Sequence, residues 1–166
     1  MDGHINRGGH RMSHSQQSEI TTSILIVEDS RSASNIIARM VAMHFPDAVV
    51  YTAYNGKTGV ELFKKYAPNI VITDIIMPEM DGIQMAIDIK SIRSETKFIV
   101  FTASTDGHFL EQLSHIGVHS FLLKPFDLNE LMMAIEKCIE DRTDISVDLI
   151  PDFACYKSIG RGLEHL

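Results

Sequence analysis

Short apolar runs alternate with segments of helical periodicity along most of this chain. The first run, Ile24-Leu25-Ile26-Val27, is typical of a strand that is buried on both faces. We predict strands over residues 24–27, 49–53, 69–73, 97–101 and 121–123. We predict helices over residues 30–44, 57–66, 82–92 and 128–139, and a further helix that carries Phe109, Leu110, Leu113 and Ile116. Consecutive strand–helix units of this kind predict an α/β fold with a doubly wound, five-stranded parallel sheet and helices on both faces.

The first predicted helix has a clear apolar stripe. Ala33, Ile36, Ile37, Met40 and Val41 recur at helical spacing, so we expect this face to pack on the sheet. The last predicted helix carries an equivalent stripe, formed by Leu131, Met132, Ile135 and Cys138.

Three stretches of different composition divide the chain. Residues 1–22 are polar and lack apolar periodicity, which is typical of a flexible N-terminal arm or a remnant of cloning. Residues 23–141 contain all of the predicted strands and helices and are expected to form one domain. Residues 142–166 are too few for a second domain, and we interpret them as a C-terminal tail or the start of a linker.

The overall charge limits the classes of partner. The 166 residues include 15 Lys and Arg against 22 Asp and Glu, which gives a formal net charge of −7. Phosphate backbones and anionic headgroups repel such a chain, so we expect no direct binding to nucleic acid or to a membrane. Apolar runs stay well below the roughly 20 residues that span a bilayer. Since 2 cysteines are also too few for a disulfide scaffold, the composition indicates a cytoplasmic protein.

Polar residues with complementary chemistry follow four of the five predicted strands. Glu28 and Asp29 end the first strand, Asp74 the third, Thr102 the fourth and Lys124 the fifth. Ligands of open parallel sheets bind outside the carboxyl ends of the strands. We therefore expect these five side chains to meet at one edge of the sheet.

This set of groups suits a metal ion and a phosphoryl group. Three crowded carboxylates favour a bound cation, and hard oxygen ligands in small number are typical of Mg²⁺ sites. Asp74 can then act as a nucleophile towards phosphorus, while Lys124 and Thr102 bind the phosphoryl oxygens. The sequence contains no glycine-rich phosphate loop, so a nucleotide site is not expected.

Each of these residues also has an ordinary explanation when it is taken alone. Asp29 or Ser30 can cap the first helix, and Asp81 can cap the third. A threonine at a strand end or a lysine on the surface needs no function. The combination of acids, a hydroxyl and an ammonium at four strand ends is what favours a shared site.

At these residues the chain resembles the receiver domain of bacterial two-component response regulators. The matching segments are Ile24–Ser30, Val71–Gly82, Phe98–Ser104 and Phe121–Phe126. The resemblance implies a flavodoxin-like sheet with strand order 2-1-3-4-5. It also implies a phosphoacceptor signalling switch that receives its phosphoryl group from a histidine kinase or a phosphotransfer protein and signals to a downstream effector or output domain.

The resemblance assigns roles to the acidic residues and the lysine. It implies that Asp74 is the phosphoacceptor and that Glu28, Asp29, Asp74 and the backbone carbonyl of Ile76 hold Mg²⁺. Lys124 would contact the phosphoryl group. Because the side chain of Ile76 is apolar, it cannot position an attacking water, and we expect slow self-dephosphorylation.

The resemblance also assigns the switch and the loops that shape the site. Thr102 would move towards the phosphoryl group and Phe121 would then turn inward, while the small Ala103 would leave the acceptor open to its donor. The loop-shaping residues would be Pro78, Gly82 and Pro125, the last after a cis peptide bond. A homodimer through the surface of the fourth helix, fifth strand and fifth helix is a further implication.

Two other classes of protein remain open at this point. An aspartate-nucleophile phosphohydrolase would also place an acid after an apolar strand, but it usually carries a second aspartate two residues further on. That position is Ile76 here, so we expect a regulatory domain and not an enzyme. An interaction module that is never phosphorylated is the second alternative.

Overall fold

The computed structural model describes residues 21–103 and 107–141 of the chain, with only the backbone of residues 107–110. The predicted C-terminal tail, most of the predicted N-terminal arm and Ser104 lie outside the described residues. Strands and helices alternate from end to end: β1 (Ser23–Val27), α1 (Arg31–His44), β2 (Val49–Ala53), α2 (Gly56–Tyr66), β3 (Ile70–Asp74), α3 (Gly82–Ile92), β4 (Lys97–Thr102), α4 (Gly107–Ile116), β5 (Ser120–Leu123) and α5 (Leu128–Glu140). The predicted elements are confirmed, with shifts of one residue at several ends.

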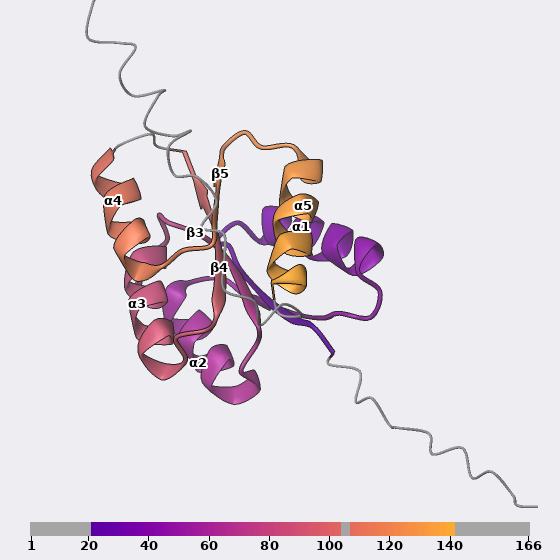
Figure 1. Ribbon diagram of the computed structural model, residues 1–166, viewed down its shortest axis with the longest axis horizontal. Helices are drawn as coiled ribbons and strands as arrows, with labels where there is room; N and C mark the ends of the chain where they lie inside the picture. The colour runs from indigo at the N-terminus through magenta and orange to yellow at the C-terminus, as the bar shows by residue number, and fades with distance from the viewer. Residues whose placement is uncertain (1–20, 104–106, 142–166) are drawn as a thin grey trace, which may run out of the picture.

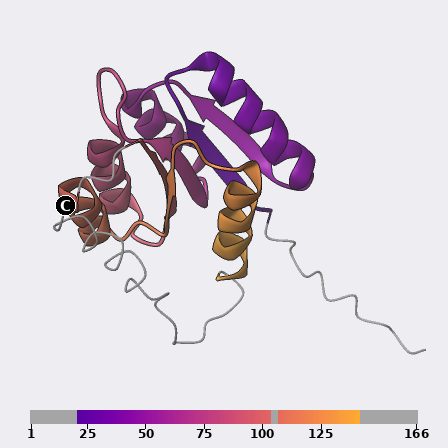
Figure 2. The same ribbon diagram turned by 90° about the horizontal axis from the view of Figure 1, so that it is seen from above.

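All five strands are parallel, in the order β2-β1-β3-β4-β5. Helices α1 and α5 cover one face of the sheet, and α2, α3 and α4 cover the other (Figures 1 and 2). The doubly wound, flavodoxin-like fold that the sequence predicted is therefore confirmed.

Strand β1 shows how the sheet builds two cores. Ile24 and Ile26 pack with residues of α1 and α5, while Leu25 and Val27 pack with residues of α2 and α3. All four side chains are fully buried, because side chains of a strand alternate between the faces and both faces are covered by helices. A continuous apolar run is thus what this central position requires.

Helices α1, α2, α3 and α5 begin at polar capping residues. The Ser30 hydroxyl accepts the backbone N–H of Ala33 at 3.3 Å, so Ser30 and not Asp29 caps α1. Asp81 caps α3 through the N–H of Gln84 at 2.8 Å, as one reading of the sequence anticipated. Asp29 is therefore not the N-cap of α1, and its side chain is exposed.

The apolar stripe of α1 is narrower than predicted. Ile37 and Val41 are buried against the sheet, but 63% of Ile36 is exposed. Ile36 lies at the border of the stripe, where the curved surface of the helix has already turned away from the sheet. Its expected core role was wrong. By contrast, the predicted stripe of α5 is buried as expected.

The far end of α5 is tied to the amino ends of β4 and β5. The carboxylate of Asp141 lies 3.2 Å from Nε2 of His119 and 3.6 Å from Nζ of Lys97. Burial and the charge of Lys97 lower the pKa of His119, an effect that Asp141 partly offsets and that Lys90 and Lys137 reinforce. At neutral pH the imidazole is therefore uncharged.

Protonation of His119 should weaken the folded state. The unfolded chain takes up the proton at the ordinary histidine pKa, about 6.5, before the folded chain does, so stability falls as the pH drops through that value. In urea unfolding from about pH 7.5 to about pH 5, we expect His119→Gln to lose less stability than the parent. The exposed His115→Gln is the control, and an identical pH profile for parent and His119→Gln would contradict the prediction.

Candidate phosphoacceptor and metal site

The register of the sheet brings the polar strand ends together. Val27 pairs with Thr73, so the residues that follow them, Glu28 and Asp74, leave neighbouring strands at the same level. Asp74 pairs with Phe101 in β4. The expected convergence at the carboxyl edge of the sheet is therefore a direct result of parallel pairing.

Three carboxylates lie close enough to share one cation. One oxygen each of Glu28, Asp29 and Asp74 falls within 4.8 Å of the others. Glu28 is buried, Asp74 is partly buried and Asp29 is exposed, so the cluster opens to solvent on one side. A small group of carboxylate oxygens with an open side fits Mg²⁺, which binds through few protein ligands and retains several waters.

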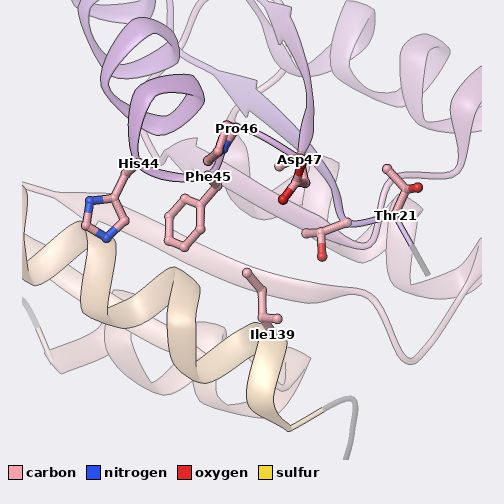
Figure 3. A pocket seen from close by; sticks show the side chains of 8 residues that line it. Thr21, His44, Phe45, Pro46, Asp47 and Ile139 are labelled. Carbon is pink, nitrogen blue, oxygen red and sulfur yellow. The ribbon is translucent and has the colours of Figure 1, made fainter. Parts of the chain in front are cut away.

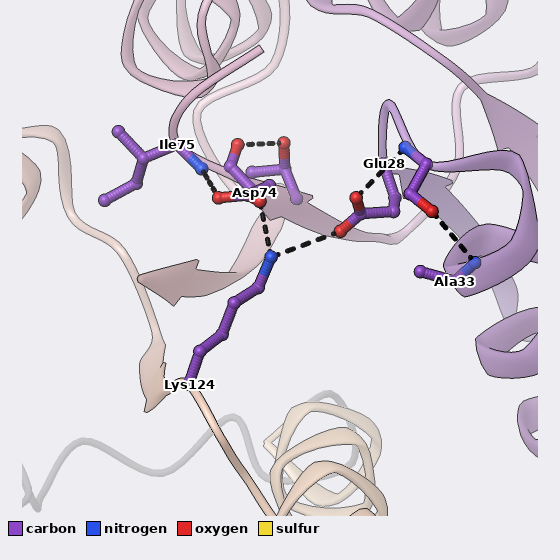
Figure 4. A network of polar contacts seen from close by, with 7 residues as sticks. Glu28, Ala33, Asp74, Ile75 and Lys124 are labelled. Carbon is purple, nitrogen blue, oxygen red and sulfur yellow. Dashed lines mark hydrogen bonds and ion pairs between the residues drawn. The ribbon is translucent and has the colours of Figure 1, made fainter. Parts of the chain in front are cut away.

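Lys124 bridges the two deeper carboxylates (Figure 4). Its Nζ lies 2.5 Å from Oδ2 of Asp74 and 3.5 Å from Oε2 of Glu28. The backbone N–H of Lys124 donates to the carbonyl of Thr102 at 2.8 Å, which extends the β4–β5 pairing and aims the side chain along the sheet edge. A cis peptide bond joins Lys124 to Pro125, as expected.

Burial and charge perturb two of these groups. Burial raises the pKa of Glu28, while the N–H donated by Ser30 and the charge of Lys124 oppose this rise. Burial alone would lower the pKa of Lys124, but the hydrogen bond and negative charge of Asp74 raise it. The ammonium is thus held in its charged form beside carboxylates that crowd each other.

The loop after Asp74 folds back tightly on the acceptor. The backbone N–H of Ile75 donates to Oδ1 of Asp74 at 2.6 Å, and the N–H of Gly82 donates to the carbonyl of Ile75 at 2.8 Å. A Cβ at Gly82 would overlap the carbonyl oxygen of Asp74, so only glycine fits there. The side chain of Ile76 is 73% exposed, and Pro78 is exposed as well.

The remaining predicted residues lie on β4 and β5. Thr102 is buried and Ala103, which follows it, is exposed. Phe121 is half-buried and packs against the small core cluster formed by Ile75, Val100 and Leu113. Phe121 therefore packs against the same apolar cluster that contains Ile75, the residue directly after Asp74.

A large apolar cavity adjoins the carboxylates. It has a volume of about 740 Å³ and lies between α1 and the β5–α5 connection. Glu28 and Lys124 line its end at the site, and Ile36, Met40, Pro125 and Phe126 are among its apolar walls. No pattern in the sequence predicted this groove. Ile36 lines the groove, but the sequence places it in the apolar stripe of the first helix, where every residue is expected to face the sheet.

A second cavity lies at the opposite end of the sheet (Figure 3). His44, Phe45, Asp47 and Ile139 are among its lining residues, and its volume is about 520 Å³. His44 pairs with Glu136 of α5 at 3.2 Å, so its imidazole links two helices. The acidic cluster and this cavity lie at opposite ends of parallel strands and cannot act on one ligand.

The fold is a flavodoxin-like α/β domain, and Glu28, Asp29, Asp74 and Lys124 cluster at the carboxyl edge of its sheet. Residues 24–136 match the model of the response regulator receiver domain. The chain belongs to the response regulator receiver domain family and is a domain of two-component signalling. Within the described residues, every helix is too short or too polar to cross a membrane.

Relatives with known names agree with this family. The chain is 33% identical to the chemotaxis protein CheY of Bacillus subtilis over 116 residues, which are 70% of this chain and 96% of that protein. It is 31% identical to the regulatory protein AtoC of Escherichia coli over 117 residues, 70% of this chain but 25% of AtoC. It covers 50% of the probable C4-dicarboxylate response regulator DctR of Bacillus subtilis. The chain thus spans a half or less of several relatives.

Solved structures show the same fold. The N-terminal domain of an uncharacterized protein from Wolinella succinogenes is 34% identical, with a TM-score of 0.69, and the match covers 74% of this chain and 97% of that one. A LuxR-family DNA-binding response regulator from Staphylococcus aureus is 28% identical, with a TM-score of 0.66 and coverage of 70% and 98%.

Removal of the Lys124 ammonium should make folding depend on Mg²⁺. In Lys124→Met the carboxylates of Glu28 and Asp74 lose their compensating charge. We therefore expect the free energy of unfolding, measured in urea with a chelator present, to fall by about 1–3 kcal/mol. Mg²⁺ should then restore more stability to this variant than to the parent, because the cation replaces the missing positive charge. The exposed Lys57→Met is the matched control. Equal stability of variant and parent in chelator would refute this account of the site.

Proposed function

We propose that this chain takes a phosphoryl group onto Asp74 from a histidine kinase or a phosphotransfer protein, with Mg²⁺ as cofactor, and thereby changes the surface that it presents to an effector. The observation that carries the proposal is the cluster of three carboxylates with Lys124 at Oδ2 of Asp74. Family membership supports it, because receiver domains are regulatory signalling domains. Residues 23–141 would form the functional unit.

In the proposed reaction, Asp74 is the nucleophile. One of its carboxylate oxygens forms a bond to phosphorus while the bond between phosphorus and the donor's imidazole nitrogen breaks, and the ring, which is already protonated on its other nitrogen, leaves as a neutral imidazole. Glu28, Asp29, Asp74 and the carbonyl of Ile76 would hold Mg²⁺, which supplies positive charge to the phosphoryl oxygens. Lys124 would donate to one phosphoryl oxygen from its place beside Asp74. Ala103 leaves room for the donor.

Formation of the acyl phosphate would then change the conformations of Thr102 and Phe121. The new charge at Asp74 attracts the Thr102 hydroxyl, and the space behind it allows Phe121 to turn inward from its half-buried position. The surface of α4, β5 and α5 would change in consequence. Leu123 and Met133 are 48% and 56% exposed on this surface, which supports its use as a partner-binding face or in a homodimer.

Two alternatives make different predictions about turnover. A phosphohydrolase needs a general acid near the nucleophile, and Ile76 offers none. An exposed apolar side chain at that position instead favours slow self-dephosphorylation. An interaction module that is never phosphorylated would have no need for three carboxylates and a lysine at one edge. The cytoplasmic location and the lack of direct nucleic-acid binding are parts of this proposal.

Incubation with Mg²⁺ and acetyl phosphate tests the proposed function. We expect the parent chain to gain the mass of one phosphoryl group, and Asp74→Asn to gain none, because the amide is not a nucleophile of comparable strength. Intact mass spectrometry measures the adduct, and a phosphate-release assay measures turnover. Continuous release of phosphate would identify a hydrolase, and the absence of any adduct would favour an interaction module.

The apolar groove beside the site supports docking of a phosphohistidine donor. Burial of the exposed Ile36 against such a protein should contribute to binding, so Ile36→Ser should reduce transfer from it by about tenfold. Transfer from acetyl phosphate should stay unchanged, because a small donor does not contact α1. Met43→Ser, exposed two turns further along α1, is the control. A parallel loss with both donors would show that the groove does not recognise the protein.

A further inference from the structure

The loop that follows Asp74 is attached at its far end to the start of α2. The backbone N–H of Gly56 donates to the carbonyl of Met80 at 3.1 Å. Next to it, Nδ2 of Asn55 donates to Oε1 of Glu79 at 3.3 Å. Two neighbouring residues of the β2–α2 turn thus bind two neighbouring residues of a loop that is distant in sequence.

The contact with Met80 requires a glycine at position 56. A Cβ at Gly56 would lie 2.5 Å from the carbonyl oxygen of Met80 and 2.8 Å from its Cγ. The first clash is with backbone, so a side-chain rotation cannot relieve it. Gly56 is the first residue of α2, where alanine would otherwise be the better helix former. The absence of a side chain at this position therefore serves the approach of the loop.

The loop itself is compact, so its attachment reaches the acceptor. Glu79 has a positive φ of 67°, and the N–H of Met80 donates to the carbonyl of Pro78 at 2.8 Å. Met77 is buried in the same core cluster as Val60 of α2. Only Ile75 and Ile76 separate this anchored part from Asp74. Because this part of the loop is short and compact, a displacement of Met80 should also displace Ile76.

We propose that Asn55 and Gly56 are positioning residues for the site, which hold the loop of residues 75–81 in the conformation that binds Mg²⁺ beside Asp74. The inference rests on the proposed function for its metal but not for its structural part. Asn55 has a second task that can be separated from the first: its Oδ1 accepts the N–H of Thr58 at 2.8 Å and so caps α2.

Gly56→Ala and Gly59→Ala form a matched pair. The second substitution lies one turn further along α2, where a Cβ would meet the flexible Sδ of Met85 at 2.6 Å and Val27 at 3.2 Å, not the loop. We expect Gly56→Ala to raise the Kd for Mg²⁺ about tenfold, as loss of outer support for metal ligands commonly does. Gly59→Ala should leave this Kd within about twofold of the parent. Isothermal titration calorimetry measures both.

Hydrogen exchange in the metal-free protein provides a readout that needs neither metal nor phosphoryl group. The backbone amides of residues 75–81, other than Pro78, which has none, should exchange faster in Gly56→Ala but not in Gly59→Ala. Asn55→Ser keeps an oxygen to cap α2 and is too short to reach Glu79, so it should show the same local change with a Kd about twofold higher. Urea unfolding of each variant separates these local effects from a loss of global stability.

The outcomes are distinct. Faster loop exchange and weaker Mg²⁺ binding in Gly56→Ala alone support the positioning role. Unchanged exchange in Gly56→Ala, or equal effects in Gly59→Ala, would overturn it. If the parent binds Mg²⁺ but accepts no phosphoryl group from acetyl phosphate, the proposed function fails, while exchange and Kd still decide the role of Asn55 and Gly56.

Discussion

Parallel pairing of β1 with β3 is the constraint on which the site depends. The pairing sets Val27 opposite Thr73 and so delivers Glu28 and Asp74 to one edge. Both strands are buried on both faces, and they are apolar from Ile24 to Val27 and from Ile70 to Ile72, with the buried Thr73 directly before Asp74. The same apolar runs that form the core therefore also concentrate the charges, since polar residues are tolerated only where the strands end.

Placing several carboxylates close together is electrostatically unfavourable, and the ammonium of Lys124 offsets this repulsion. A buried glutamate with a raised pKa and a neighbouring aspartate share one ammonium, which arrives from the far side of β4. Asp29, the third carboxylate of the cluster, is exposed on its open side. Carboxylates that can hold a cation next to an ammonium that can hold an anion are the groups that the proposed phosphoryl transfer would use.

Much of the fold and of the candidate site was predictable, because hydrophobic periodicity identifies the strands and helices and the polar residues directly after the strands identify the site. The strands, the helices and the five polar residues at four strand ends could be identified from spacing, and family resemblance supplied the strand order and the cis bond before Pro125. Ile36 was assigned to the core because helical periodicity does not say how wide a face the sheet covers. The groove beside the carboxylates and the contact of Gly56 with Met80 were not predictable either, since they join segments with no shared pattern.

The amino-acid sequence alone is enough to predict that this chain folds as alternating strands and helices and that acids and a lysine stand at strand ends. Local patterns suffice for this, because periodicity and β-branched runs reflect burial on one or two faces. The folded structure was needed to show that Ser30 caps α1 instead of Asp29, that Ile36 faces solvent, and that the turn before α2 contacts the loop after Asp74. Those features depend on distances between segments that are far apart in the chain, and such distances are set by packing.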